Sequence, residues 1–164
     1  MPVRVRLAVA AAVLSLIVGI SPFAVPVAPS ALAMTIEGGE AVKDLPGYKS
    51  AETLIKEEKY EDAITALNAL GKPDDADVLN LLGYAHRKIG KVDEGIVFYT
   101  KALAANPQHR GAHEYLGEAY LIKNDLKSAE ELYVKLKDIC GLFGCEEASE
   151  LSEAIEAFKK KQGS

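Results

Sequence analysis

The chain has only two cysteines, Cys140 and Cys145, and a short segment of four residues separates them. It therefore lacks the Cys-x-x-Cys of thiol oxidoreductases and the Cys-x-x-Cys-His of haem attachment. It also lacks a glycine-rich phosphate loop, a Gly-x-Ser-x-Gly elbow and a His-Glu-x-x-His pair. These absences leave no residue pattern that indicates catalysis. We therefore expect a protein that is not an enzyme and that has no cofactor and no metal site.

No apolar run is long enough to span a bilayer comfortably. The main run, residues 7–20, is shorter than the roughly 20 residues that a transmembrane helix needs. Arg4 and Arg6 precede the run and Ala-Leu-Ala follows at 31–33, which is the plan of a secretory signal with a small-residue cleavage site. We predict that residues 1–33 are a cleaved signal peptide and that the protein is exported to the periplasm. An uncleaved N-terminal membrane anchor is the alternative, and cleavage would leave no membrane insertion.

Basic residues are outnumbered by acidic ones. The chain has 19 Lys and Arg against 24 Asp and Glu, and segment 1–33 carries two of the arginines and no acid. The mature chain would thus hold 17 basic side chains (19 minus 2) and 24 acidic ones, a net charge of −7. An acidic domain has no electrostatic footprint for nucleic acid and no basic face for anionic lipid. We therefore expect neither as a partner.

Two stretches of the chain repeat one pattern with a period of 34 (113 minus 79). The landmarks of the first are Leu79, Leu82, Gly83, His86, Gly95, Tyr99 and Ala102, and those of the second are His113, Leu116, Gly117, Tyr120, Ala129, Tyr133 and Leu136. A weaker copy precedes them, in which Ala51 corresponds to Gly83, an offset of 32 (83 minus 51). This period and pattern resemble the tetratricopeptide repeat (TPR), a helix–turn–helix unit that stacks into a superhelix.

The resemblance implies an all-α, TPR-type solenoid of three repeats, at about 44–75, 76–109 and 110–141. Residues 34–46 would be a flexible leader to a TPR domain at 47–162. Apolar residues at helical spacing in 147–161 indicate a final amphipathic helix that caps the third repeat, with Glu150 and Glu153 on its opposite, outer face. The expected helices are 48–58, 60–70, 76–89, 92–105, 109–123, 125–139 and 147–161.

Small residues of the repeat explain how its helices pack. Gly83, Gly95 and Gly117 would let helix backbones approach closely, while Tyr99 and Tyr133 fill the spaces beside them. Glycine inside a helix costs about 1 kcal/mol relative to alanine, so we expect close packing at Gly95.

The two cysteines, Cys140 and Cys145, favour a disulfide, because a close, even pair in an exported protein is usually oxidised. Such a bond would fix the corner between the last repeat helix and the cap. The alternative is a small redox-linked periplasmic factor that uses the same two thiols. His109 and His113 could share a helix face, but His113 takes a large-residue position of the repeat, so packing is the simpler interpretation.

The resemblance also implies that the first helix of each repeat lines a concave groove that holds a protein or peptide partner. The groove residues it predicts are Tyr48, Glu52, Asp77, Asn80, Tyr84, Arg87, Glu114 and Glu118. Asn80 could pair with a ligand backbone, and Arg87 could fork onto a carboxylate. Gly111 and Tyr115 stand where a carboxylate-clamp TPR has basic residues, so we expect a different ligand. We expect a monomer, with self-association through the repeat faces as the alternative.

Overall fold

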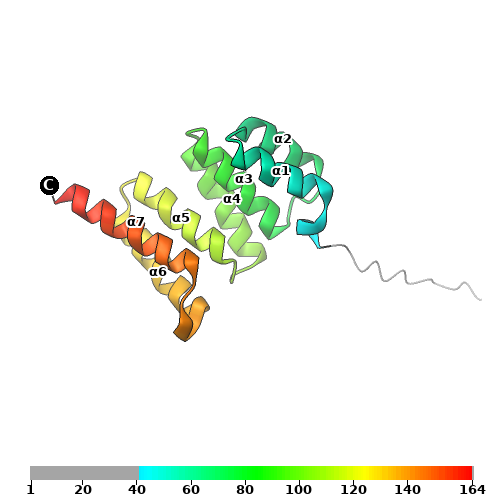
Figure 1. Cartoon of the computed structure of the whole chain (residues 1–164). Helices are drawn as coiled ribbons and strands as arrows, with labels where there is room; N and C mark the ends of the chain where they lie inside the picture. Colours follow the sequence, from blue (N-terminus) through cyan, green and yellow to red (C-terminus); the bar gives the residue numbers. More distant parts are fainter. Residues whose placement is uncertain (1–40, 164) are drawn as a thin grey trace, which may run out of the picture. The chain divides into compact units, whose positions relative to one another are not determined.

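The computed structural model describes residues 41–163. The predicted signal peptide and most of the predicted leader lie outside the described residues. Every regular element of residues 41–163 is a helix (Figure 1). In chain order these are η1 (Val42–Asp44), α1 (Pro46–Lys56), α2 (Tyr60–Ala69), α3 (Ala76–Lys88), α4 (Val92–Ala105), α5 (Arg110–Ile122), α6 (Leu126–Cys140), η2 (Gly141–Phe143) and α7 (Glu146–Gln162).

The helices pack as three consecutive pairs, α1 with α2, α3 with α4 and α5 with α6, followed by α7. This arrangement confirms the predicted all-α solenoid with three repeats and a final helix. Bounds differ from expectation by a few positions. For example, α1 begins at Pro46, whose fixed φ and missing N–H suit the first turn of a helix. In the third repeat α5 begins only at Arg110, because His109 is its N-cap.

One turn geometry recurs inside each pair. Glu58, Gly90 and Asn124 have φ of 60°, 84° and 60°, and each lies between the two helices of its repeat. Left-handed backbone suits glycine and is tolerated by asparagine, whereas Glu58 is an uncommon residue there. The intervals between the turns, 32 (90 minus 58) and 34 (124 minus 90), equal the offsets of the sequence pattern. The first repeat is therefore a true copy, slightly shorter than the second.

The small residues lie where helices touch. A Cβ added to Gly83 would be 2.6 Å from the Tyr99 ring, and one added to Gly95 would be 3.0 Å from the carbonyl oxygen of Gly83. Tyr99 is fully buried, and it fills the space that glycine leaves. The expected close packing in the second repeat is thus present.

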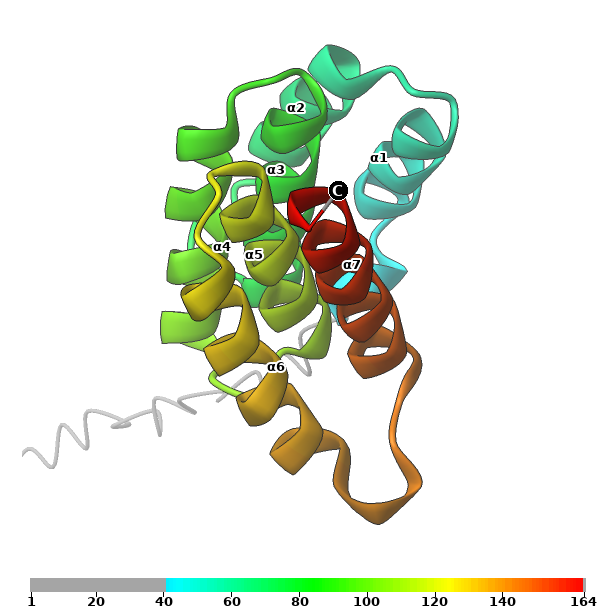
Figure 2. The same cartoon turned by 90° about the vertical axis from the view of Figure 1, so that its left-hand side faces the viewer.

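The third repeat packs differently, because α7 lies against both α5 and α6 (Figure 2). A Cβ on Gly117 would be 2.6 Å from Leu151 Cδ1, so a residue of α7 covers the surface that Tyr99 covers in the second repeat. Tyr133, which we expected to fill this space, is only half-buried. Leu151 and Ile155 instead join the core of the third repeat.

Among the helices of residues 41–163, none combines the length and the apolar character that a membrane span needs.

Candidate functional site: a groove between α3, α5 and α7

Three helices enclose a hollow of about 590 Å³, which we call the groove. Its lining residues are Tyr84, Arg87 and Lys88 from α3, Glu114, Tyr115 and Glu118 from α5, and Glu150, Glu153, Ala154 and Ala157 from α7. Four of the eight predicted site residues therefore meet here: Tyr84, Arg87, Glu114 and Glu118. The capping helix supplies one wall, which the sequence did not lead us to expect.

A row of three tyrosines runs across all three repeats, with Tyr60 on α2, Tyr84 on α3 and Tyr115 on α5. The ring centroids of Tyr60 and Tyr84 are 6.4 Å apart, and those of Tyr84 and Tyr115 are 5.1 Å apart. Lys88 Nζ lies 5.8 Å from the Tyr60 centroid and 5.7 Å from the Tyr84 centroid. These separations suit aromatic and cation–π contacts. The row gives the groove a rigid, amphipathic edge that carries a positive charge.

Arg87 is committed to partners within the fold. Its Nη2 lies 2.7 Å from Glu118 Oε2, and its Nε donates a hydrogen bond to the Tyr99 hydroxyl (3.3 Å). Its guanidinium carbon also lies 5.4 Å from the Tyr84 centroid and 5.6 Å from the Tyr115 centroid. Our expectation of an arginine free to fork onto a ligand carboxylate is therefore not met. Arg87 instead links α3, α4 and α5.

Glu114 lines the groove and is only 3% exposed. Burial raises the pKa of Glu114 to about 9, and a hydrogen bond with Glu150 of α7 and the charges of Glu150, Glu118 and Glu147 contribute to this rise. A carboxyl with this pKa is protonated at neutral pH and acts as a donor. Glu114 can thus donate the hydrogen bond that joins the third repeat to Glu150 of α7.

The predicted α1 residues lie elsewhere. Tyr48 is 3% exposed and packs with Ala51, Leu67 and Val78, so it is a core residue rather than an open groove contact. Burial raises its pKa, and Asp77 and Glu52 add to the effect. Glu52 is half-buried on α1.

Asp77 forms a structural junction with a lysine and a histidine. Its Oδ1 lies 2.8 Å from Lys43 Nζ and 3.1 Å from His109 Nε2, which ties η1, α3 and the start of α5 together. The carboxylate is therefore already paired.

Asn80 is 8% exposed, and its Oδ1 has no hydrogen-bond partner among the described residues. An unpaired buried acceptor costs about 1–3 kcal/mol. Its Nδ2 lies 3.3 Å from the position that a Cβ on Gly111 would take. Asn80 thus has an acceptor that could bind a ligand backbone, as we expected, but the residue is buried.

The histidines have structural roles. His109 Nδ1 accepts a hydrogen bond from the Ala112 amide (3.1 Å) and its Nε2 donates to Asp77, so both ring nitrogens are engaged. His113 Nε2 donates to the carbonyl oxygen of Pro107 (2.9 Å). Among residues 41–163 there is no cluster of three His, Cys, Asp or Glu side chains that could hold a metal ion.

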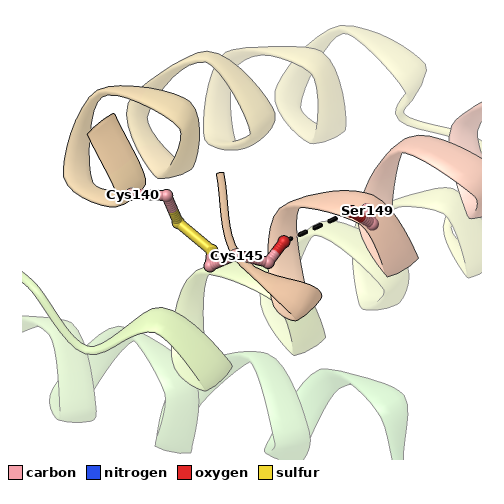
Figure 3. Close-up of a disulfide and its surroundings, with 3 residues drawn as sticks. All are labelled: Cys140, Cys145 and Ser149. Atoms are coloured by element: carbon pink, nitrogen blue, oxygen red, sulfur yellow. Dashed lines mark hydrogen bonds between the residues drawn. A yellow bond between two sulfur atoms is a disulfide. The ribbon is translucent and has the colours of Figure 1, made fainter. Parts of the chain in front are cut away.

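Cys140 and Cys145 are joined in a disulfide, with Cα atoms 5.5 Å apart (Figure 3). The bond links the last residue of α6 to the N-cap of α7, as the sequence predicts. The Ser149 hydroxyl donates to the carbonyl oxygen of Cys145 (3.3 Å), which adds a contact in the first turn of α7. The bond therefore fixes the start of the helix that walls the groove.

Several groove residues are not predicted by the sequence pattern. Tyr115 and the α7 residues Glu150 and Glu153 line the groove, although the pattern places both glutamates on the outer face of the cap. Repeat positions predict contacts within and between repeats, whereas α7 follows a non-repeating loop. The sequence feature that could have predicted this wall is Leu151, a large residue that lies one repeat period (151 minus 117, or 34) after Gly117 and packs against it.

Comparison with known proteins identifies the family. Residues 48–108 and 98–140 match the family model described as "Tetratricopeptide repeat", which together covers more than half of the chain. The chain therefore belongs to the tetratricopeptide repeat family, as its repeat pattern predicted. No curated protein matches the chain significantly.

Solved structures show the same fold. The type III secretion translocator chaperone SycD of Yersinia enterocolitica is 24% identical, with a TM-score of 0.62 over 72% of this chain and 84% of that chain. A second SycD structure, in complex with a peptide of the translocator YopD, is 24% identical, with a TM-score of 0.60 over 71% of this chain and 92% of that chain. The TPR domain of Sgt2 from Aspergillus fumigatus is 22% identical, with a TM-score of 0.61 over 70% of this chain and 76% of that chain.

Proposed function

We propose that this protein is a non-enzymatic interaction module that holds a peptide or an extended protein segment in the groove between α3, α5 and α7. The observation that carries the proposal is the Tyr60–Tyr84–Tyr115 row with Lys88 beside it. Rigid aromatic side chains that keep a polar tip are the residues that contribute most at binding surfaces. The SycD structure with a bound YopD peptide supports peptide binding as a use of this fold.

The groove residues have different roles in this proposal. The tyrosine row contacts the ligand, and Lys88 attracts an acidic or carbonyl-rich part of it. Arg87 and Glu118 form the floor and hold the three helices in register. We further propose that the protein acts in the periplasm as an adaptor or assembly factor, because residues 1–33 have the plan of an export signal.

Affinity capture from the envelope fraction tests the proposal. The groove variant is Tyr84→Ala/Lys88→Glu, which leaves Arg87 in place because its loss would disturb the fold. The matched control is Tyr133→Ala/Lys101→Glu, which changes the same residue types on α6 and α4. Both variants are first shown to be folded by circular dichroism.

A partner that binds the wild type and the control but not the groove variant would support the proposal. Its binding segment would then be made as a peptide and titrated by fluorescence anisotropy, where we expect a loss of at least tenfold in affinity for the groove variant. Equal affinity of the peptide for both variants would show that the binding surface lies outside the groove.

A further inference from the structure

The disulfide loop presents two apolar side chains to solvent. Leu142 and Phe143 are 101% and 102% exposed, more than any other exposed large hydrophobic residue of the described chain. Single exposed apolar residues are common, but an adjacent leucine and phenylalanine with full exposure indicate a contact surface. We call this pair the knob.

The knob is held in place by its loop. Gly141 and Gly144 both have φ of +67°, and the Cys140–Cys145 disulfide closes the loop at its base. Left-handed backbone at these two positions favours glycine. The loop therefore has a defined shape, so the knob loses little conformational freedom when it binds.

A cavity with a partly apolar lining lies elsewhere on the same molecule. It has a volume of about 680 Å³ and lies between the C-terminal ends of α5 and α7, and we call it the α5–α7 cavity. Its apolar lining consists of Leu121, Ile122, Ala154, Ala157 and Phe158. Ile122 is 52% exposed although it borders this apolar surface. Asn124 and Gln162 close one end with a hydrogen bond of 3.4 Å from Gln162 Nε2 to Asn124 Oδ1.

The knob and the α5–α7 cavity lie at opposite ends of α7. The knob lies just before Glu146, the first residue of the helix, and the cavity is lined by residues 154–162 near its end. A helix of this length spans about 25 Å. The knob therefore lies too far from the cavity of its own molecule, whereas a second copy displaced along α7 brings the two together.

Charges near the two surfaces are complementary. Asp138 and Glu146 flank the knob loop in the sequence, and both are exposed. Among the charged residues that line the α5–α7 cavity, Arg87 and Glu118 neutralise each other in an ion pair, so the net positive charge of the lining is that of Lys161. The acidic flanks also disfavour an anionic lipid surface as the knob's target.

We propose that this protein self-associates head to tail, with the Leu142–Phe143 knob of one copy seated in the α5–α7 cavity of another. The contact joins two different surfaces, so it is heterologous and extends to a third copy unless the rotation closes a ring. Its small area makes the association weak, so the monomer that we expected persists at low concentration. The proposal does not rest on the proposed function, although Arg87, Glu118, Ala154 and Ala157 line both the groove and the α5–α7 cavity.

Sedimentation velocity over about 10 µM to 1 mM tests this proposal. The knob variant is Leu142→Ser/Phe143→Ser, and the cavity variant is Ile122→Glu/Ala157→Glu, at positions already exposed to solvent. The control is Val134→Ser, which removes another exposed apolar residue, on α6. All proteins carry the same N-terminus, and circular dichroism verifies their folding.

We expect the wild type and the control to associate as concentration rises, and each of the two test variants to remain monomeric. An equimolar mixture of the knob and cavity variants should form a dimer and nothing larger, because only one intact knob and one intact cavity remain. A wild type that stays monomeric, or a mixture that fails to dimerise, overturns the proposal. Flotation with phosphatidylcholine vesicles completes the test: knob-dependent binding by a monomeric wild type would assign the knob to a lipid surface instead.

Discussion

Replacing Glu114 with glutamine isolates the contact between the third repeat and α7. The carboxyl is buried against Glu150, and its pKa rises from the ordinary 4.5 to about 9, mainly through burial. A raised carboxyl pKa stabilises the fold fully below about pH 4.5, and this stabilisation is lost as the pH rises toward 9. Glutamine keeps the shape and the donor but has no proton to lose, so Glu114→Gln should stabilise the protein at neutral and alkaline pH.

The size of the effect follows from the pKa difference. Between pH 5 and pH 8 the folded carboxyl stays protonated while the unfolded one is ionised, and at 1.36 kcal/mol per pH unit the upper limit is about 4 kcal/mol. Glu114 and Glu150 both line a groove that is open to water. Since nearby water screens the charge and reduces the effect, we expect a stability gain about 2 kcal/mol larger at pH 8 than at pH 5, or roughly 8 °C in Tm.

Thermal unfolding followed by circular dichroism at pH 5 and pH 8 measures this gain. The matched control is Glu118→Gln on the same helix, which breaks the ion pair with Arg87 and should lower the Tm at both pH values. A Glu114→Gln variant whose Tm relative to wild type is the same at the two pH values would refute the assignment of a protonated Glu114.

Three further substitutions test the packing and the disulfide. Gly95→Leu should lower the free energy of unfolding by about 3 kcal/mol or more, because even a Cβ would lie 3.0 Å from an α3 carbonyl oxygen; an unchanged melting curve would argue against the repeat register. Gly117→Ala should cost about 1–2 kcal/mol and speed amide hydrogen exchange in α7, because its Cβ would displace Leu151, and unchanged exchange would count against this contact. Cys140→Ser/Cys145→Ser should lower stability by roughly 2 kcal/mol yet keep groove binding, whereas loss of binding by a folded variant would show that the bond is needed to hold α7 as a wall of the groove.

The fold could be predicted well from the sequence because the same packing pattern occurs in three successive repeats. Glycine at positions 83 and 95 and a buried tyrosine at position 99 specify one packing geometry, and the structure has it. The weak first repeat was harder to recognise in the sequence, since small residues occupy positions where the repeat pattern has large ones. The left-handed turn at Glu58 identifies the first repeat as a copy of the others. A glutamate in the sequence does not predict that backbone conformation, because glutamate seldom adopts it.

The candidate site could be predicted only in part. A repeat position indicates the face of the helix on which a side chain lies, but it does not indicate how far that side chain is buried. Tyr84 lies in the groove as expected, whereas Tyr48 from an equally suitable helix is in the core. Arg87 is at the right place but is paired with Glu118. Such pairing depends on side chains from different repeats, and no single-repeat pattern encodes it.

The position of α7 connects stability and binding in this molecule. Leu151 covers the exposed end of the solenoid, and the neighbouring Glu150 meets Glu114 at the groove floor. A solenoid must cover its terminal repeat in any case, so the groove gains a wall from a helix that stability already requires. It follows that variants of the α7 residues that contact the third repeat change folding and binding together. The binding surface is therefore best tested through Tyr84 and Lys88, which lie in the groove without joining the cap to the core.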